Sequence, residues 1–177
     1  TGEILGADIM LEWSYVTNRI VADNLYNDNS LEDKNCCTAA HFQQVENFLG
    51  INHIKNMNLG EEMEEELVKQ SLYRLVLHEV GHTIGLNHNF KASALLTTDE
   101  LNNKEIVDEK GVTSSVMDYP AININKNPEN QALFFDIKPG FYDIWAIQFG
   151  YTQFSENEEE GLDKILSRST EKELAFA

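Results

Sequence analysis

The sequence predicts an α+β domain that is mostly helical and carries a small mixed sheet or a single edge strand. Three observations favour this fold class: a β-compatible run at residues 3–13, a long helical pattern at residues 60–84 and a shorter one at residues 142–149. The chain has 177 residues, of which 42% are hydrophobic and 24% charged, and this composition suits a globular domain with its own core. Without internal repeats or low-complexity linkers, a single domain over residues 1–177 is the simplest organisation.

The N-terminal part begins with the run at residues 3–13, which we interpret as a strand at the edge of a sheet. Residues 14–26 carry apolar side chains at mixed spacing, so both a helix and a second strand remain open. Residues 27–35 are rich in Asn, Asp, Ser and Lys, which is typical of a loop. A helix is expected at residues 38–49, whereas residues 51–59 fit no element clearly.

The two cysteines of the chain, Cys36 and Cys37, are adjacent. A disulfide between neighbouring residues is strained and rare, and two cysteines are too few for a disulfide scaffold. Because neighbouring side chains also diverge, the pair is a poor zinc site. We expect loop or core thiols.

The clearest element is a helix that begins near Asn58 or Gly60 and ends before Gly85, a residue that can adopt positive φ. Its first turns carry acidic side chains, which the positive end of a helix dipole favours: Glu61, Glu62, Glu64, Glu65 and Glu66. Apolar side chains then recur every four residues, at Val68, Leu72, Val76, Val80 and Ile84. Leu75 lies beside this repeat. This spacing predicts that the face they share is buried in a core.

The remainder of the chain contains less regular structure. A long polar stretch at residues 86–118 and a Pro-containing segment at residues 119–139 are expected to be mostly irregular. Residues 142–149 predict a further helix, residues 155–161 an acidic surface turn, and residues 162–174 a terminal amphipathic helix.

The charge of the chain excludes some partners. Thirty acidic against thirteen basic residues give a net charge of −17 at pH 7, which repels nucleic-acid phosphates and anionic membrane surfaces. We therefore expect no nucleic-acid partner. No run approaches the roughly 18 apolar residues of a membrane-spanning helix, so no membrane-spanning segment is expected.

Three histidines on and after the long helix have the spacing of a zinc site. His78 and His82 are four residues apart and so lie on one helical face, where both imidazoles can reach one metal ion. Glu79 lies beside them and can take a proton from the attacking water without being a ligand. A chain reversal at Gly85 would bring His88 to the metal as a third ligand, which leaves the fourth position for water.

An isolated histidine on a helix is more often a packed core residue than a ligand. Here the chain has five histidines, and three of them fall at i, i+4 and i+10 with glutamate and glycine at the matching places. This concentration favours Zn²⁺ binding. His41 and His53 are expected to be surface or core residues.

With these residues the sequence resembles the metzincin clan of zinc endopeptidases, whose motif HExxHxxGxxH is matched at every specified position of residues 78–88. Residues 115–120, Ser-Val-Met-Asp-Tyr-Pro, look like the Met-turn of that clan. The resemblance implies that Met117 forms an apolar floor beneath the zinc ligands. It also implies that Tyr119 ligates zinc or hydrogen-bonds the tetrahedral intermediate, the alternative being a packed wall tyrosine.

A third similarity lies at residues 140–148, which look like the C-terminal helix of matrixins and serralysins. There, Asp143 would be structural and bond backbone near the Met-turn. Taken together, the sequence of residues 88–93 and the Met-turn sequence at residues 115–120 are most similar to the Met-zincin domain of large bacterial proteins predicted to be exported proteases. The resemblance implies an exported, periplasmic or cell-surface location.

Metzincins ordinarily place several strands and a backing helix before the active-site helix, whereas one convincing strand precedes it here. We therefore expect residues 1–60 to form an upper part with the edge strand, and residues 61–177 to carry the active-site helix, the Met-turn and the C-terminal helices. The chain opens on Thr1 and lacks signal-peptide features, which suggests a mature or excised segment. Upstream parts of a longer chain are expected to pack against it.

The function implied is zinc-dependent hydrolysis of peptide bonds in a peptide or protein substrate, with Glu79 as general base and Tyr119 as a second catalytic residue. The alternative is a non-catalytic peptide- or protein-binding module that retains the zinc site. Glu79 argues against that alternative, because it contributes to chemistry more than to metal affinity. A structural zinc would require a fourth ligand, for which Tyr119 is the nearby candidate.

Overall fold

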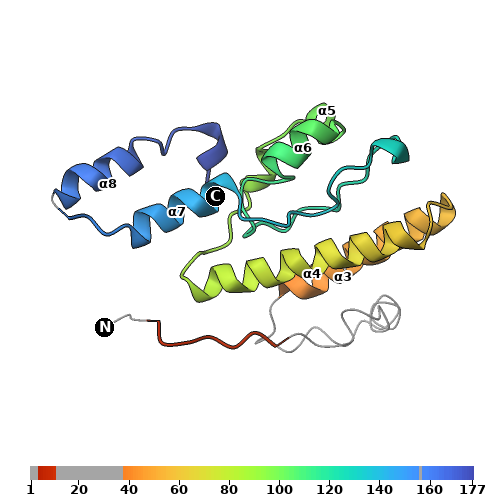
Figure 1. The fold of residues 1–177 in the computed structure, drawn as a ribbon, viewed down its shortest axis with the longest axis horizontal. Coiled ribbons are helices and arrows are strands. Elements are labelled where there is room, and N and C mark those ends of the chain that lie inside the picture. Colours follow the sequence, from red (N-terminus) through yellow and green to blue (C-terminus); the bar gives the residue numbers. More distant parts are fainter. Residues whose placement is uncertain (1–3, 11–37, 156) are drawn as a thin grey trace.

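A computed structural model describes residues 4–10, 38–155 and 157–177 of the chain (Figure 1). The longer helices within these residues are α3 (Thr38–Asn56), α4 (Glu61–Thr83), α5 (Thr98–Leu101), α6 (Lys104–Lys110), α7 (Phe141–Tyr151) and α8 (Glu158–Leu166). Three 3₁₀ turns accompany them: η1 (Ala92–Ala94), η2 (Pro128–Asn130) and η3 (Lys172–Leu174). Among these helices, none combines the length and the apolarity that crossing a bilayer requires.

The predicted α+β class is wrong for the part of the chain that the structure describes, which contains helices and irregular segments but no strand or sheet. Residues 4–10 of the expected edge strand are irregular and mostly exposed. A strand forms only when its backbone bonds a neighbouring strand, and a suitable spacing of apolar residues does not provide that neighbour. Residues 111–139 are also irregular outside η2, and side chains bond much of their backbone instead of a ladder. The expectations for residues 14–26, for residues 27–35 and for the cysteines lie outside the described residues.

Helices α3 and α4 pack side by side as an antiparallel hairpin (Figure 1). The predicted helix at residues 38–49 is confirmed and continues to Asn56. The predicted long helix is confirmed at Glu61–Thr83, with Gly60 at its N-cap. The connection between the two helices is therefore short.

The buried face of α4 differs from the one predicted. Val76 and Val80 are 37% and 38% exposed, whereas Leu75 is buried as expected. The buried side chains of α4 are Leu67, Gln70, Ser71, Arg74, Leu75, His78 and Gly81. Polar residues occupy this face because they bond other segments of the chain, a requirement that apolar spacing cannot reveal.

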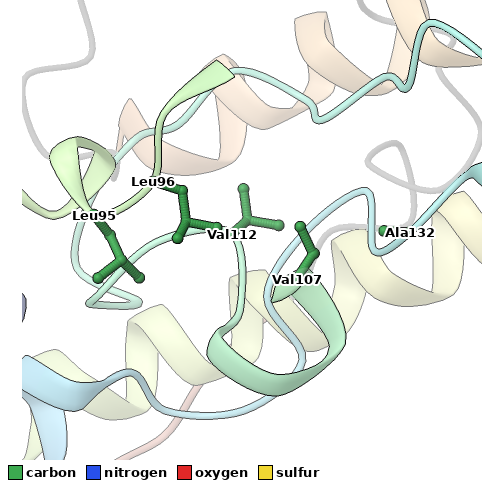
Figure 2. Close-up of a cluster of buried hydrophobic side chains, with 5 residues drawn as sticks. All are labelled: Leu95, Leu96, Val107, Val112 and Ala132. Atoms are coloured by element: carbon green, nitrogen blue, oxygen red, sulfur yellow. The ribbon is translucent and has the colours of Figure 1, made fainter. Parts of the chain in front are cut away.

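Two small apolar cores hold the irregular segments in place. One joins α3 and α4 to the following chain through Ile54, Leu67, Phe134 and Phe135. The other includes Val107 of α6 and packs against side chains of α5 and α6, and Figure 2 shows its members: Leu95, Leu96, Val107, Val112 and Ala132. The segment that leads to the predicted Met-turn starts from this second core.

The C-terminal part forms a second helical pair. The predicted helix at residues 142–149 is confirmed as α7. The expected acidic turn at residues 155–161 instead leads into α8 at Glu158, because the Asn157 side chain caps the helix by accepting from Glu160 N–H. Helix α8 then ends at Leu166, earlier than predicted.

Candidate metal centre

The three histidines of the motif converge. His78 and His82 lie one turn apart on α4, and their Nε2 atoms are 3.1 Å from each other. Nε2 of His88, which follows the helix, lies 3.0 Å from Nε2 of His82. The possible ligand atoms of all three residues fall within 4.8 Å of one another. The spacing of the three histidines in the sequence therefore places their imidazole nitrogens close together in space.

A glycine turn brings His88 back to the helix. Gly85 has φ +94°, a conformation that L side chains rarely adopt. Around it, Leu86 N–H donates to Gly81 O at 2.9 Å and Gly85 N–H to His82 O at 3.0 Å, which is the Schellman motif. The reversal predicted at Gly85 is confirmed.

Replacing Gly85 with alanine is expected to lower the free energy of unfolding by about 1 kcal/mol or more, because a Cβ disfavours positive φ. Urea denaturation followed by circular dichroism measures the change. Gly150→Ala is the matched control, since Gly150 lies inside α7 with nothing near its missing Cβ, and alanine there is expected to be neutral or stabilising. Equal destabilisation by both substitutions would contradict the role of the turn.

Backbone carbonyls fix the tautomers of the two helical histidines. Nδ1–H of His78 donates to Val116 O at 2.8 Å, and Nδ1–H of His82 donates to Leu86 O at 3.0 Å. Burial lowers the pKa of His78 to about 3, an effect that the bond to Val116 opposes and the nearby Arg74 charge reinforces. Burial therefore keeps the His78 ring neutral. Because Nδ1 is the hydrogen-bond donor in both rings, Nε2 is the nitrogen whose lone pair faces the other ring.

Such facing lone pairs repel unless a cation lies between them. Four-coordinate zinc with bonds of about 2.0–2.1 Å to nitrogen would separate two ligand nitrogens by about 3.3 Å. The observed Nε2 separations of 3.1 and 3.0 Å are close to that value. The donor set of His78, His82 and His88 thus fits a metal ion.

Tyr119 lies next to the three-histidine group. Its Oη is 2.8 Å from Nε2 of His88, and its ring lies 4.8 Å from that of His88, centroid to centroid. Two exposed aromatic rings flank it: Phe42 stacks on it at 6.1 Å and Phe90 meets it edge-on at 5.6 Å. A hydroxyl group is thereby placed within hydrogen-bond distance of one of the three imidazoles.

Met117 is fully buried against α4. A Cβ added to Gly81, between the two helical histidines, would clash with Sδ of Met117. Met117 O also accepts from Asn89 N–H at 3.0 Å, next to His88. The side chain thus packs against the helix turn that carries both imidazoles, and the absence of a side chain at Gly81 permits this approach.

Asp143 bonds the backbone of the segment predicted to be the Met-turn, as expected. Its carboxylate accepts from Ser115 Oγ at 2.5 Å, and from the N–H groups of Val116 and Gly140, each at 2.8 Å. Burial raises the pKa of Asp143, and these hydrogen bonds oppose the rise. Helix α7 is in this way attached to the segment that bonds His78 through Val116 O.

Glu79 is half-buried on α4, between His78 and His82 in the chain. Burial is the main reason that the pKa of His88 is lowered, and the negative charge of Glu79 opposes this effect. The Glu79 carboxylate therefore acts electrostatically on the third imidazole. Its catalytic role stays a prediction.

The remaining expectations concern residues outside the cluster. His53 is half-buried on α3 and takes no part in the three-histidine group, while the side chain of His41 is not described. Sequence reasoning missed three buried charged residues that bond the segment between Val112 and Tyr119: Arg74, Asp118 and Asp136. A charged residue one turn before His78, on the helix face of the two histidines, was the available signal for Arg74.

Comparison with known proteins agrees with this geometry. The model of the family described as Met-zincin matches residues 60–177, well over half of the chain, including all three histidines. No curated protein and no solved structure matches the chain. Because the family match contains the converged histidines together with Met117 and Tyr119, the chain belongs to the Met-zincin family.

Proposed function

We propose that the chain is the catalytic domain of a zinc-dependent endopeptidase and a segment of a longer protein. His78, His82 and His88 hold the zinc ion. The observation that carries this proposal is the convergence of their Nε2 atoms, two of which are set as lone-pair donors by backbone carbonyls. Family membership supports the same assignment.

Bound zinc would supply Lewis-acid chemistry, which polarises a carbonyl group and makes water a better nucleophile at neutral pH. Glu79 takes the proton of the attacking water and passes it to the leaving amine. The Oη of Tyr119, 2.8 Å from Nε2 of His88, donates to the oxyanion that forms on the scissile carbonyl. Met117 keeps the helix turn of His78 and His82 in place from below.

The proposed substrate is a peptide or protein. The proposed location is exported, periplasmic or at the cell surface, which the resemblance of the chain to predicted exported proteases supports. We also propose that an upstream part of the longer chain packs on the outer face of α4. That face holds a groove of about 750 Å³ with an apolar lining that includes Ile51, Val68, Leu72, Tyr73 and Val76. Exposed apolar side chains of this extent favour a covering partner.

Metal removal tests the proposal. The protein is expected to contain about one zinc per chain by atomic absorption and to cleave a quenched-peptide library. Dialysis against a chelator is expected to abolish cleavage, and stoichiometric zinc to restore it, because the three imidazoles are preformed. The measurement is made on this chain and on the longest natural chain that contains it.

The two possible failures have different meanings. Stoichiometric zinc without cleavage, in the long chain as well, would favour the alternative of a non-catalytic peptide- or protein-binding module. Absence of zinc would refute the assignment of His78, His82 and His88.

A further inference from the structure

Arg74 is a buried cation on the helix that carries the metal ligands. It lies one turn before His78 and only 3% of its surface is exposed. Arginine is rarely buried at this level unless its donors are matched by acceptors, because an unmatched buried charge is costly. The partners of Arg74 therefore indicate what its burial achieves.

The guanidinium of Arg74 bonds the backbone on both sides of Met117. Nη1 donates to Val116 O and Nη2 donates to Asp118 O. Val116 O is also the acceptor of Nδ1–H of His78, at 2.8 Å. Arg74 and His78 thus share one carbonyl oxygen, so the position of that oxygen affects the direction in which the imidazole points.

Other side chains fix the N–H groups of the same segment. Asp136 accepts from the backbone of Val112 and Thr113, and Asp143 accepts from Val116 N–H. Asp118 accepts from Tyr119 N–H at 2.7 Å and from Ser93 N–H at 2.7 Å. These carboxylates accept from N–H groups of the segment, and the charge of Arg74 also acts on Asp136 and Asp143, whereas the guanidinium itself donates to the carbonyl groups that flank Met117.

We propose that Arg74 is a positioning residue for the metal centre: its two-pronged contact with Val116 O and Asp118 O fixes the Met-turn and thereby aims the His78 imidazole. The inference rests on the proposed zinc binding by His78. Hydrogen-bond partners of metal-ligating histidines set ring orientation and ligand basicity, and Arg74 holds such a partner in place. A planar fork suits two carbonyls at once, which the single ammonium group of lysine does not.

The test compares Arg74→Met and Arg74→Lys with wild type in zinc affinity and in the visible spectrum of the cobalt(II)-substituted protein. Both variants are expected to bind zinc about 10- to 100-fold more weakly, the range found when an outer hydrogen-bond partner of a metal ligand is lost. Their cobalt spectra are expected to differ from wild type, because the geometry of the His78 nitrogen changes.

Gln70→Met is the matched control. Gln70 lies on α4 one turn before Arg74, is 4% exposed, and likewise bonds distant backbone, by accepting from Phe134 N–H and Phe135 N–H. Its replacement is expected to lower the free energy of unfolding and to leave zinc affinity and the cobalt spectrum unchanged. A merely structural role for Arg74 would make the two positions behave alike.

The outcomes separate the two proposals. Wild-type zinc affinity and spectrum in a folded Arg74→Met protein would overturn the role of Arg74 and leave the zinc site standing. If Arg74→Met does not fold, Arg74→Lys decides: weaker binding supports the role, and unchanged binding overturns it. A wild-type protein that binds no zinc would overturn this inference together with the proposed function.

Discussion

Glu79→Gln is expected to lower kcat/KM for peptide cleavage by about 10²- to 10⁴-fold, the contribution typical of a general base. The amide keeps the size of the side chain but cannot accept the proton of the attacking water. Glu79 belongs neither to the three-histidine group nor to the fully buried part of α4, so zinc binding and folding are expected to persist. Zinc content by atomic absorption and cleavage of a fluorescent peptide, measured on the same preparation, separate the two effects.

Glu62→Gln provides the control for this change. Glu62 is an exposed glutamate on the same helix, outside both the three-histidine group and the groove on α4, so the substitution removes an equal charge without touching the imidazoles. Its cleavage rate is expected to match wild type. Full activity in Glu79→Gln would remove Glu79 from the mechanism, and loss of zinc there would instead assign it to the support of the metal.

His82→Ala removes one of the proposed zinc ligands. The loss of an outer hydrogen-bond partner weakens metal binding by about 10- to 100-fold, and the loss of zinc affinity in His82→Ala is expected to be larger. His82 is the central member of the cluster, with its Nε2 at 3.1 Å from that of His78 and at 3.0 Å from that of His88. It is half-buried, so alanine there is better tolerated than at the fully buried His78. Competition with a chromophoric chelator gives the affinity.

His53→Ala is the matched histidine control. His53 is also half-buried, but it lies on α3 outside the three-histidine group. Zinc affinity is expected to be unchanged in this variant. Equal losses at His53 and His82 would show that zinc binds histidines at large and would contradict a defined centre.

The sequence predicted those parts of the site that depend on local geometry. His78 and His82 share a helix face whatever packs around them, and a glycine able to adopt positive φ ends the helix before His88. The bond of Asp143 to the backbone of Val116, in the predicted Met-turn, was predicted through the family resemblance.

Predictions that depend on distant partners were less successful. The apolar repeat that includes Val76 and Val80 suggested the wrong buried face, because Arg74 and Gln70 are buried through bonds to backbone 42 to 65 residues away. The strand at residues 3–13 failed in its described part for a similar reason, since a strand requires a pairing segment that its own sequence does not specify.

The contacts of Asn89 have a consequence for the order of folding. Its fully buried side chain donates to Ala175 O, 86 residues along the chain, and accepts from Ala177 N–H, 88 residues along. His78 and His82, by contrast, come together as soon as one turn of α4 forms. Closing a long loop costs more entropy and time than forming a helical turn. The first two imidazoles are therefore in register early, whereas the bonds that join the loop after His88 to Ala175 and Ala177 form only when the C-terminal residues dock.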